Sequence, residues 1–210
     1  MQVEHVGGRP RVDATAWIAP NAVLSGPVIV GPNVRILYGA VLTAEGGAEL
    51  VVESECVIME QAVLRAAGRF PLRLGERVLV GPHATLTGCR VGARSFVATG
   101  VMIFNGAVLG EACVVALGGK VHIDTELADG TWVPMSYIAF GRPGRLYPPE
   151  QAPAVHDELA RLSFAKYVFG VESTGRSRAE VMDEMMQKYT RALGAHRTDT
   201  PVREQDKGGR

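Results

Sequence analysis

The feature that most constrains this chain of 210 residues is a repeat of six residues. Aliphatic side chains recur at this interval with only a few breaks, and the residue four positions later is usually small or β-branched. A short fixed period decides the architecture before any single motif does. The aliphatic positions are Ile18, Leu24, Val30, Ile36, Leu42, Val52, Ile58, Leu64, Leu74, Val80, Leu86, Val91, Val97, Ile103, Leu109, Val115, Val121, Leu127 and Val133.

Such a repeat folds as a short strand plus a turn for each hexapeptide. Three hexapeptides make one triangular coil, and coils stack at the strand-pairing distance of ~4.8 Å, so the aliphatic column fills the axis. Glycine directly after the aliphatic residue and proline next, as in Gly31-Pro32, suit the turns. The sequence therefore predicts a mainly β fold, a parallel β-helix over residues 1–147. Breaks at 43–51 and 65–73 predict protruding loops.

A helical period replaces the six-residue period after Pro148-Pro149. The apolar face of the first expected helix is formed by Val155, Leu159 and Leu162. A second helix is expected from the capping-box pattern at Ser177 to the stop at Gly194. Residues 148–197 are thus predicted to form a helical segment that packs on the β-helix, because their apolar faces are too large for free exposure. Residues 198–210 are predicted to be a disordered polar tail.

The composition narrows the classes of partner. Lys plus Arg and Asp plus Glu both number 22, so no basic field favours nucleic acid or an acidic membrane. No apolar run approaches the ~18 residues of a membrane span, and the first residues lack the pattern of a secretion signal. Cys56, Cys89 and Cys113 are widely spaced and form no CxxC pair, which argues against a disulfide framework. A cytoplasmic location without nucleic-acid or membrane partners is expected.

Three stretches give a family resemblance. The stretches are Leu37-Tyr-Gly-Ala-Val-Leu-Thr-Ala-Glu45, Val78-Leu-Val-Gly-Pro-His-Ala-Thr-Leu-Thr-Gly-Cys89 and Phe104-Asn-Gly-Ala107. They resemble segments of γ-class carbonic anhydrase-like proteins. The resemblance covers roughly residues 10 to 145. It implies a left-handed helical turn and a homotrimer whose sites lie between neighbouring subunits.

The same resemblance implies that the family zinc site is absent from this chain. The family's three histidine ligands fall on Arg65, Pro82 and Thr87, and none of these supplies the neutral imidazole that holds a catalytic zinc. Two acidic positions of the family keep their charge as Glu45 and Glu60. Zinc is therefore not expected at the family position, no metal ligand is assigned, and the cofactor stays unknown.

Candidate site residues follow from assigning the three faces of the prism in order. This assignment places Thr43, Arg65, Thr87, Phe104 and His122 in one outward column. His83, Glu60 and Glu45 are the candidate catalytic residues, because a near-neutral proton carrier beside acids suits acid–base chemistry. The candidate ligand-binding residues are Arg65, Thr87, Asn105 and His122. Together they favour a small anionic molecule as substrate or ligand.

Two other interpretations of these residues stay open. Arg65, Glu45 and Glu60 are also consistent with interfacial ion pairs that replace the metal in holding a trimer together. Alternatively, His83, His122 from another subunit and a glutamate are consistent with a relocated metal site.

Three functions compete at this point. The first is a γ-carbonic anhydrase-like protein that no longer hydrates carbon dioxide by the zinc route and acts on or binds another small molecule. The second is a hexapeptide-repeat acyltransferase with His83 or His122 as its base. The third is a non-catalytic trimeric scaffold that offers its helices to a partner. His5, His156 and His196 lie on terminal segments and are expected to have no specific role.

Overall fold

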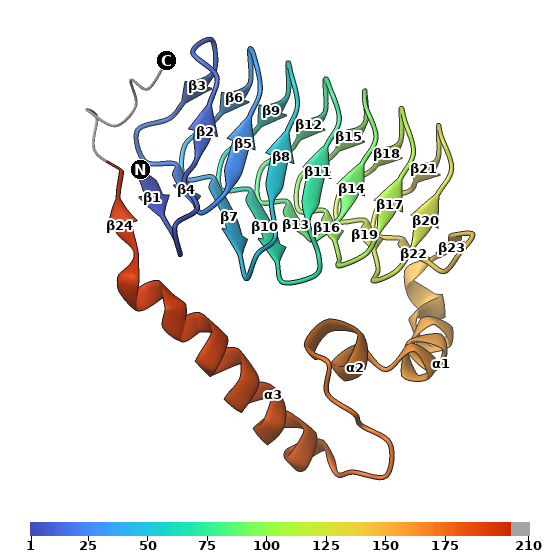
Figure 1. Ribbon diagram of the computed structural model, residues 1–210. Helices are drawn as coiled ribbons and strands as arrows, with labels where there is room; N and C mark the ends of the chain where they lie inside the picture. Colours follow the sequence, from blue (N-terminus) through green and yellow to red (C-terminus); the bar gives the residue numbers. More distant parts are fainter. Residues whose placement is uncertain (203–210) are drawn as a thin grey trace.

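The computed structural model describes residues 1–202 and shows a parallel β-solenoid followed by helices. Successive coils stack along one axis, and the chain after the last coil returns along one side of the stack towards its own beginning (Figure 1). Strands of successive coils pair in parallel to form three sheets. The mainly β fold and the parallel β-helix predicted from the repeat are confirmed.

Each of the three sheets runs along one face of the solenoid. The sheets are numbered in the order in which the chain passes through them within one coil. Sheet 1 contains β1 (Gln2–Glu4), β4 (Val23–Ser25), β7 (Val41–Glu45), β10 (Val63–Ala67), β13 (Thr85–Thr87), β16 (Met102–Ile103), β19 (Lys120–Val121) and β22 (Ile138–Phe140), with β24 (Thr200–Pro201) and β23 (Arg145–Tyr147) at its two edges. Sheet 2 contains β2 (Arg11–Val12), β5 (Val28–Val30), β8 (Leu50–Val52), β11 (Leu72–Leu74), β14 (Arg90–Val91), β17 (Val108–Leu109) and β20 (Glu126–Leu127). Sheet 3 contains β3 (Trp17–Ile18), β6 (Arg35–Ile36), β9 (Val57–Ile58), β12 (Leu79–Val80), β15 (Phe96–Val97), β18 (Val114–Val115) and β21 (Trp132–Val133).

The core is the aliphatic column of the repeat. Leu64 of β10 pairs in register with Leu42 on one side and Leu86 on the other, and all three side chains are fully buried. Alternate residues of each strand point out of the solenoid, so the six-residue period fixes which side chains face the axis and which face outward.

The expected protruding loops at 43–51 and 65–73 are mostly strand, which corrects that prediction. The strands β7 and β10 each run for five residues, and Arg65 to Ala67 pair in register with Thr43 to Glu45. Short turns then lead into β8 and β11. The extra residues of one coil lie beside those of the next, so they extend the ladder of hydrogen bonds instead of leaving it.

Three helices follow the solenoid. They are α1 (Ala152–Leu162), α2 (Phe164–Phe169) and α3 (Arg178–Leu193), with the 3₁₀ turns η1 (Pro149–Gln151) and η2 (Gly194–Thr198) before and after them. Ser177 and Glu180 form the predicted capping box at the start of α3. The apolar face of α1, with Val155 buried, packs on Phe140 and Tyr147 at the last coil, as expected for a segment that covers the β-helix.

The tail is ordered further than the sequence predicted. Disorder was expected from residue 198, yet β24 pairs antiparallel with β1, and the Val202 N–H donates to the Gln2 carbonyl at 2.9 Å. The open edge of the first strand supplies the backbone partners that a polar segment needs to become fixed. Residues 203–210 lie outside the described part of the chain. Between residues 1 and 202, no helix combines the length and hydropathy needed to cross a bilayer.

Replacing Leu64 by Ala should lower the free energy of unfolding by about 2–5 kcal/mol, because the side chain is fully buried between two leucines of neighbouring coils. Urea unfolding followed by circular dichroism measures this change. Met182→Ala serves as the control because Met182, on α3, is 53% exposed, and its effect should stay within about 0.5 kcal/mol. Equal losses for both variants would contradict an axial core.

Candidate functional site

The outward column of sheet 1 has the order that the repeat predicts. Arg65 lies opposite Thr43 on one neighbouring strand and opposite Thr87 on the other. Further along the column, the rings of Phe104 and His122 lie side by side at a tilt of 32°, with centroids 5.3 Å apart. The three sequence-assigned faces are therefore correct in this region.

Arg65 is held by an acid from the next strand and a tyrosine from the C-terminal helix. Its guanidinium donates to Glu45 Oε2 at 2.9 Å and to the Tyr189 hydroxyl at 2.5 Å, and it lies 5.5 Å from the centre of the Tyr189 ring. Burial lowers the pKa of Arg65, but the hydrogen bonds with Tyr189 and Glu45 outweigh burial and raise that pKa overall. A fixed positive charge thus occupies the centre of the column.

The extension of β7 explains why Glu45 reaches this arginine. Alternate residues of β7 point outward, so Glu45 follows Thr43 on the same face, and Thr43 is the register partner of Arg65. Glu45 and Arg65 are therefore diagonal neighbours on adjacent strands. Arg65 Nε is buried and is the one fully covered side-chain nitrogen or oxygen in residues 1–202 that lacks a hydrogen-bond partner.

The other two positions matched to the family ligands offer no metal donors. The Thr87 hydroxyl donates within the column, at 3.3 Å from Asn105 Oδ1 and also from the Ile103 carbonyl. Pro82 has no side-chain donor atom. The residues Arg65, Pro82 and Thr87 together therefore cannot coordinate zinc, which needs sulfur, imidazole nitrogen or carboxylate oxygen.

Glu60 and His83 lie at the corner between sheets 3 and 1, away from the arginine cluster. The His83 N–H donates to the Glu60 carbonyl at 3.0 Å, and the His83 backbone is left-handed with a φ of 56°. Their side chains make no hydrogen bond or ion pair within residues 1–202. The structure thus brings together Arg65, Glu45, Thr87 and Asn105 but leaves Glu60 and His83 at the solvated corner.

His122 borders a cavity of about 410 Å³ between sheet 1 and the first two helices. The cavity is lined by Phe104, His122, His156, Leu159, Ala160, Ser163, Phe164, Ala165 and Ser173. The His122 ring lies against Phe104 and meets the Phe140 ring edge-on at 5.8 Å. Burial lowers the pKa of His122, so the ring is neutral at pH 7.

The tautomer of His122 follows from its backbone neighbour. The Ile123 N–H donates to His122 Nδ1 at 2.8 Å, so Nδ1 is the acceptor and the single proton of the neutral ring lies on Nε2. In this orientation Nε2 is a hydrogen-bond donor. His122 is therefore suited to hold an acceptor group of a ligand and is not placed to remove a proton.

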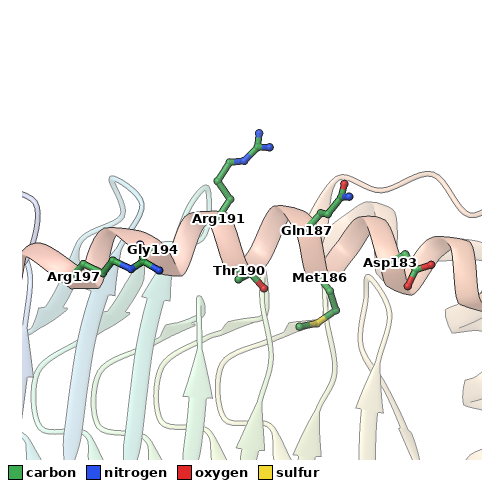
Figure 2. A pocket seen from close by; sticks show the side chains of 7 residues that line it. All are labelled: Asp183, Met186, Gln187, Thr190, Arg191, Gly194 and Arg197. Carbon is green, nitrogen blue, oxygen red and sulfur yellow. The ribbon is translucent and has the colours of Figure 1, made fainter.

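A larger groove of about 810 Å³ runs along α3 and η2 (Figure 2). Figure 2 shows Met186 and Thr190 pointing towards the strands, whereas Gln187 and Arg191 point away. Its lining residues all come from the C-terminal segment, and none belongs to the outward column. The smaller cavity beside His122 is therefore the better candidate for a ligand site.

Sequence reasoning did not find the contributions of the C-terminal segment to this region. Tyr189 contacts Arg65, Tyr167 packs on Phe70 with ring centroids 5.4 Å apart, and His156 lines the cavity. The helical period predicts the existence of these helices. The helical period gives no information on which coil of the solenoid each helical residue contacts.

No family model matches the chain. It is 31% identical over 127 residues to the mitochondrial γ carbonic anhydrase 2 of Arabidopsis thaliana, covering 58% of this chain and 45% of the relative. It is 36% identical over 107 residues to the carnitine operon protein CaiE of Escherichia coli, covering 51% and 54%. The chain spans about half the length of these curated relatives.

A solved structure supports the fold. A putative acetyltransferase of Bacillus cereus superposes with a TM-score of 0.50 at 21% identity, over 90% of this chain and 96% of that one. That likeness concerns the solenoid architecture alone. The chain is a hexapeptide-repeat β-solenoid protein whose homologues are γ-carbonic anhydrase-like and CaiE-like proteins.

Proposed function

We propose that this protein is a homotrimeric γ-carbonic anhydrase-like protein that does not hydrate carbon dioxide by the family's zinc route and instead binds a small molecule beside sheet 1. The pairing of Arg65 is the observation that supports the loss of the zinc route. Its guanidinium, paired with Glu45 and Tyr189, lies at the position matched to the first zinc ligand. A guanidinium has only N–H donors and no lone pair to offer a metal, and its pairing also engages the neighbouring carboxylate of Glu45.

Carbon dioxide hydration by purified protein should equal the uncatalysed rate, with or without added zinc. The zinc route needs a metal-bound water with a pKa near 7, and Arg65, Pro82 and Thr87 cannot hold the metal. Stopped-flow measurement with a pH indicator gives the rate, and an authentic γ-carbonic anhydrase is the positive control. Zinc-dependent hydration that an Asp199→Asn variant retains would refute the proposal, because Asp199 belongs to the one group within residues 1–202 that could hold a metal away from these positions.

The homotrimer is supported by the unequal character of the three faces. Sheet 1 is covered in part by the C-terminal segment, and sheet 2 presents charged residues such as Arg73, which pairs with Glu53. Sheet 3 presents an outward row that is mostly apolar and lies open to solvent. In register order, this row is Trp17, Arg35, Val57, Leu79, Phe96, Val114 and Trp132.

The outward row of sheet 3 exposes more apolar surface to solvent than is usual for a monomer. Trp17, Phe96 and Trp132 are 44%, 43% and 61% exposed, and Leu117 and Met135 at the adjoining corner are 52% and 63% exposed. Apolar surface of this continuity marks an interaction face. A second copy of the chain fits because the row follows the solenoid axis, so copies related by a threefold axis parallel to their solenoids can each set this row against an adjoining part of the next copy.

The protein should elute in light-scattering chromatography at three times its chain mass of 22.4 kDa. Phe96→Asp should shift the mass towards that of a single chain, because it places a charge in the middle of the apolar row. Arg90→Asp on the exposed surface of sheet 2 is the matched control and should leave the trimer intact. A monomeric native protein, or dissociation by the control alone, would contradict this interface.

The cavity beside His122 favours a ligand with an apolar part and an acceptor group such as a carboxylate. Phe104 and Phe164 supply aromatic surface, and His122 Nε2–H supplies a donor. Arg65 is not the anion-binding group here because Glu45 and Tyr189 already occupy its guanidinium. The acyltransferase alternative has less support because half-buried His122 in this cavity presents a donor where a base is needed.

Benzoate, which combines an aromatic ring with a carboxylate, should shift the His122 ring resonances in a titration followed by nuclear magnetic resonance. Ala160→Trp should abolish the shift, because Ala160 lines the cavity and a larger side chain fills it. Ala154→Trp, at another exposed position of α1, is the control and should leave the shift unchanged. Equal responses of the two variants would show that benzoate binds elsewhere.

A further inference from the structure

Two histidines and an aspartate meet where the two ends of the chain lie side by side. The Asp199 carboxylate is shared between two imidazoles, with Oδ1 2.7 Å from His5 Nδ1 and Oδ2 2.8 Å from His196 Nδ1. The two rings are close, with centroids 4.4 Å apart. His5 is 5% exposed, so the cluster is covered on one side by the first coil.

Local structure brings these three residues together. Val3 pairs with Pro201 and Glu4 with Thr200 in the antiparallel ladder of β1 and β24, so the next position in this register sets His5 opposite Asp199. His196 lies in η2, and Asp199 ends that turn. In a 3₁₀ turn, side chains three residues apart lie on the same side, which directs His196 and Asp199 to one point.

We propose that His5, His196 and Asp199 bind one zinc ion, through His5 Nδ1, His196 Nδ1 and an Asp199 oxygen. One ligand atom from each residue lies within 4.8 Å of the others. Ligand atoms around a tetrahedral zinc, each about 2.0–2.1 Å from the metal, lie about 3.3 Å apart. The Asp199 oxygens lie 2.7 and 2.8 Å from the two Nδ1 atoms, so these contacts have to open by about 0.5–0.6 Å to admit the metal.

The second ring nitrogen of His196 faces a suitable partner. His196 Nε2 lies 3.6 Å from Glu45 Oε2, and Arg65 holds the same carboxylate. A metal-binding histidine usually donates its other N–H to a carboxylate, which fixes the ring and the tautomer. When zinc occupies Nδ1, the proton of the neutral ring lies on Nε2, directed at Glu45.

The donor set selects the class of metal. Two imidazole nitrogens and one carboxylate oxygen suit zinc and similar transition metals, whereas magnesium and calcium prefer oxygen alone. Three protein ligands leave a fourth position for water. This site uses none of the positions matched to the family zinc ligands, so it is independent of the proposed loss of carbon dioxide hydration.

Zinc at this site would fasten the C-terminal segment to the first coil. His5 directly follows β1, Asp199 directly precedes β24 and His196 lies in η2, so one ion joins the first strand to the segment that leads into β24. Since binding to the folded state alone stabilises that state, the ladder between β1 and β24 should open less often when zinc is bound.

The test uses the full chain without a histidine tag, stripped by a chelator and titrated with zinc chloride in a calorimeter. One zinc per chain is expected, and hydrogen exchange at the Val202 amide, which donates to Gln2, should slow. Asp199→Asn and His196→Gln should abolish this binding. Glu45→Gln should weaken it by about 10–100-fold, and His156→Ala, at an exposed helical position, should leave it unchanged.

X-ray absorption of the zinc-loaded native protein gives a readout that does not depend on variants folding. Two imidazoles with oxygen ligands are expected around the metal. Magnesium chloride should produce no heat above dilution. Absence of zinc binding, a metal environment without two imidazoles, or full binding by folded Asp199→Asn and His196→Gln variants would each overturn the proposal.

Discussion

The in-register stacking of one coil on the next is the constraint on which the rest of this structure depends. Leu42, Leu64 and Leu86 occupy the same place in successive coils, so each coil buries its axial side chains only because its neighbours do so. A shift by one residue would exchange every axial side chain with an outward one. The same constraint aligns the outward residues, and both the polar centre around Arg65 and the apolar row of sheet 3 are products of that alignment.

The region around Arg65 shows what a solenoid has to supply when an arginine stands in an outward column that the C-terminal helices cover. The guanidinium is partly buried, and such a charge requires partners. Glu45 comes from the extended strand β7, and Tyr189 comes from a helix more than 120 residues later in the chain. The internal pair of Arg65 and Glu45 matches the ion-pair interpretation in its chemistry, although both partners lie within one chain and Glu60 takes no part.

The sequence predicted the solenoid and the outward column because a six-residue period determines both the axis and the face of each residue. It also predicted α3, whose capping box is local information. The docking of that helix and the pairing of β24 with β1 escaped prediction because contacts between distant segments leave no periodic signal. His196 and Asp199 stand three residues apart, yet that spacing acquires chemical meaning only once His5, near the other terminus, is placed beside them.

A stack of coils has two ends, and the last strand of a sheet at either end has unpaired backbone groups that can bind a strand of another chain. In sheet 1 an antiparallel strand pairs with the outermost parallel strand at each end: β24 pairs with β1, and β23 pairs with β22. An incoming copy therefore meets a reversed strand instead of the next step of the parallel ladder. The two reversed strands thus keep the parallel ladder of sheet 1 from being continued by another copy at either end of the solenoid.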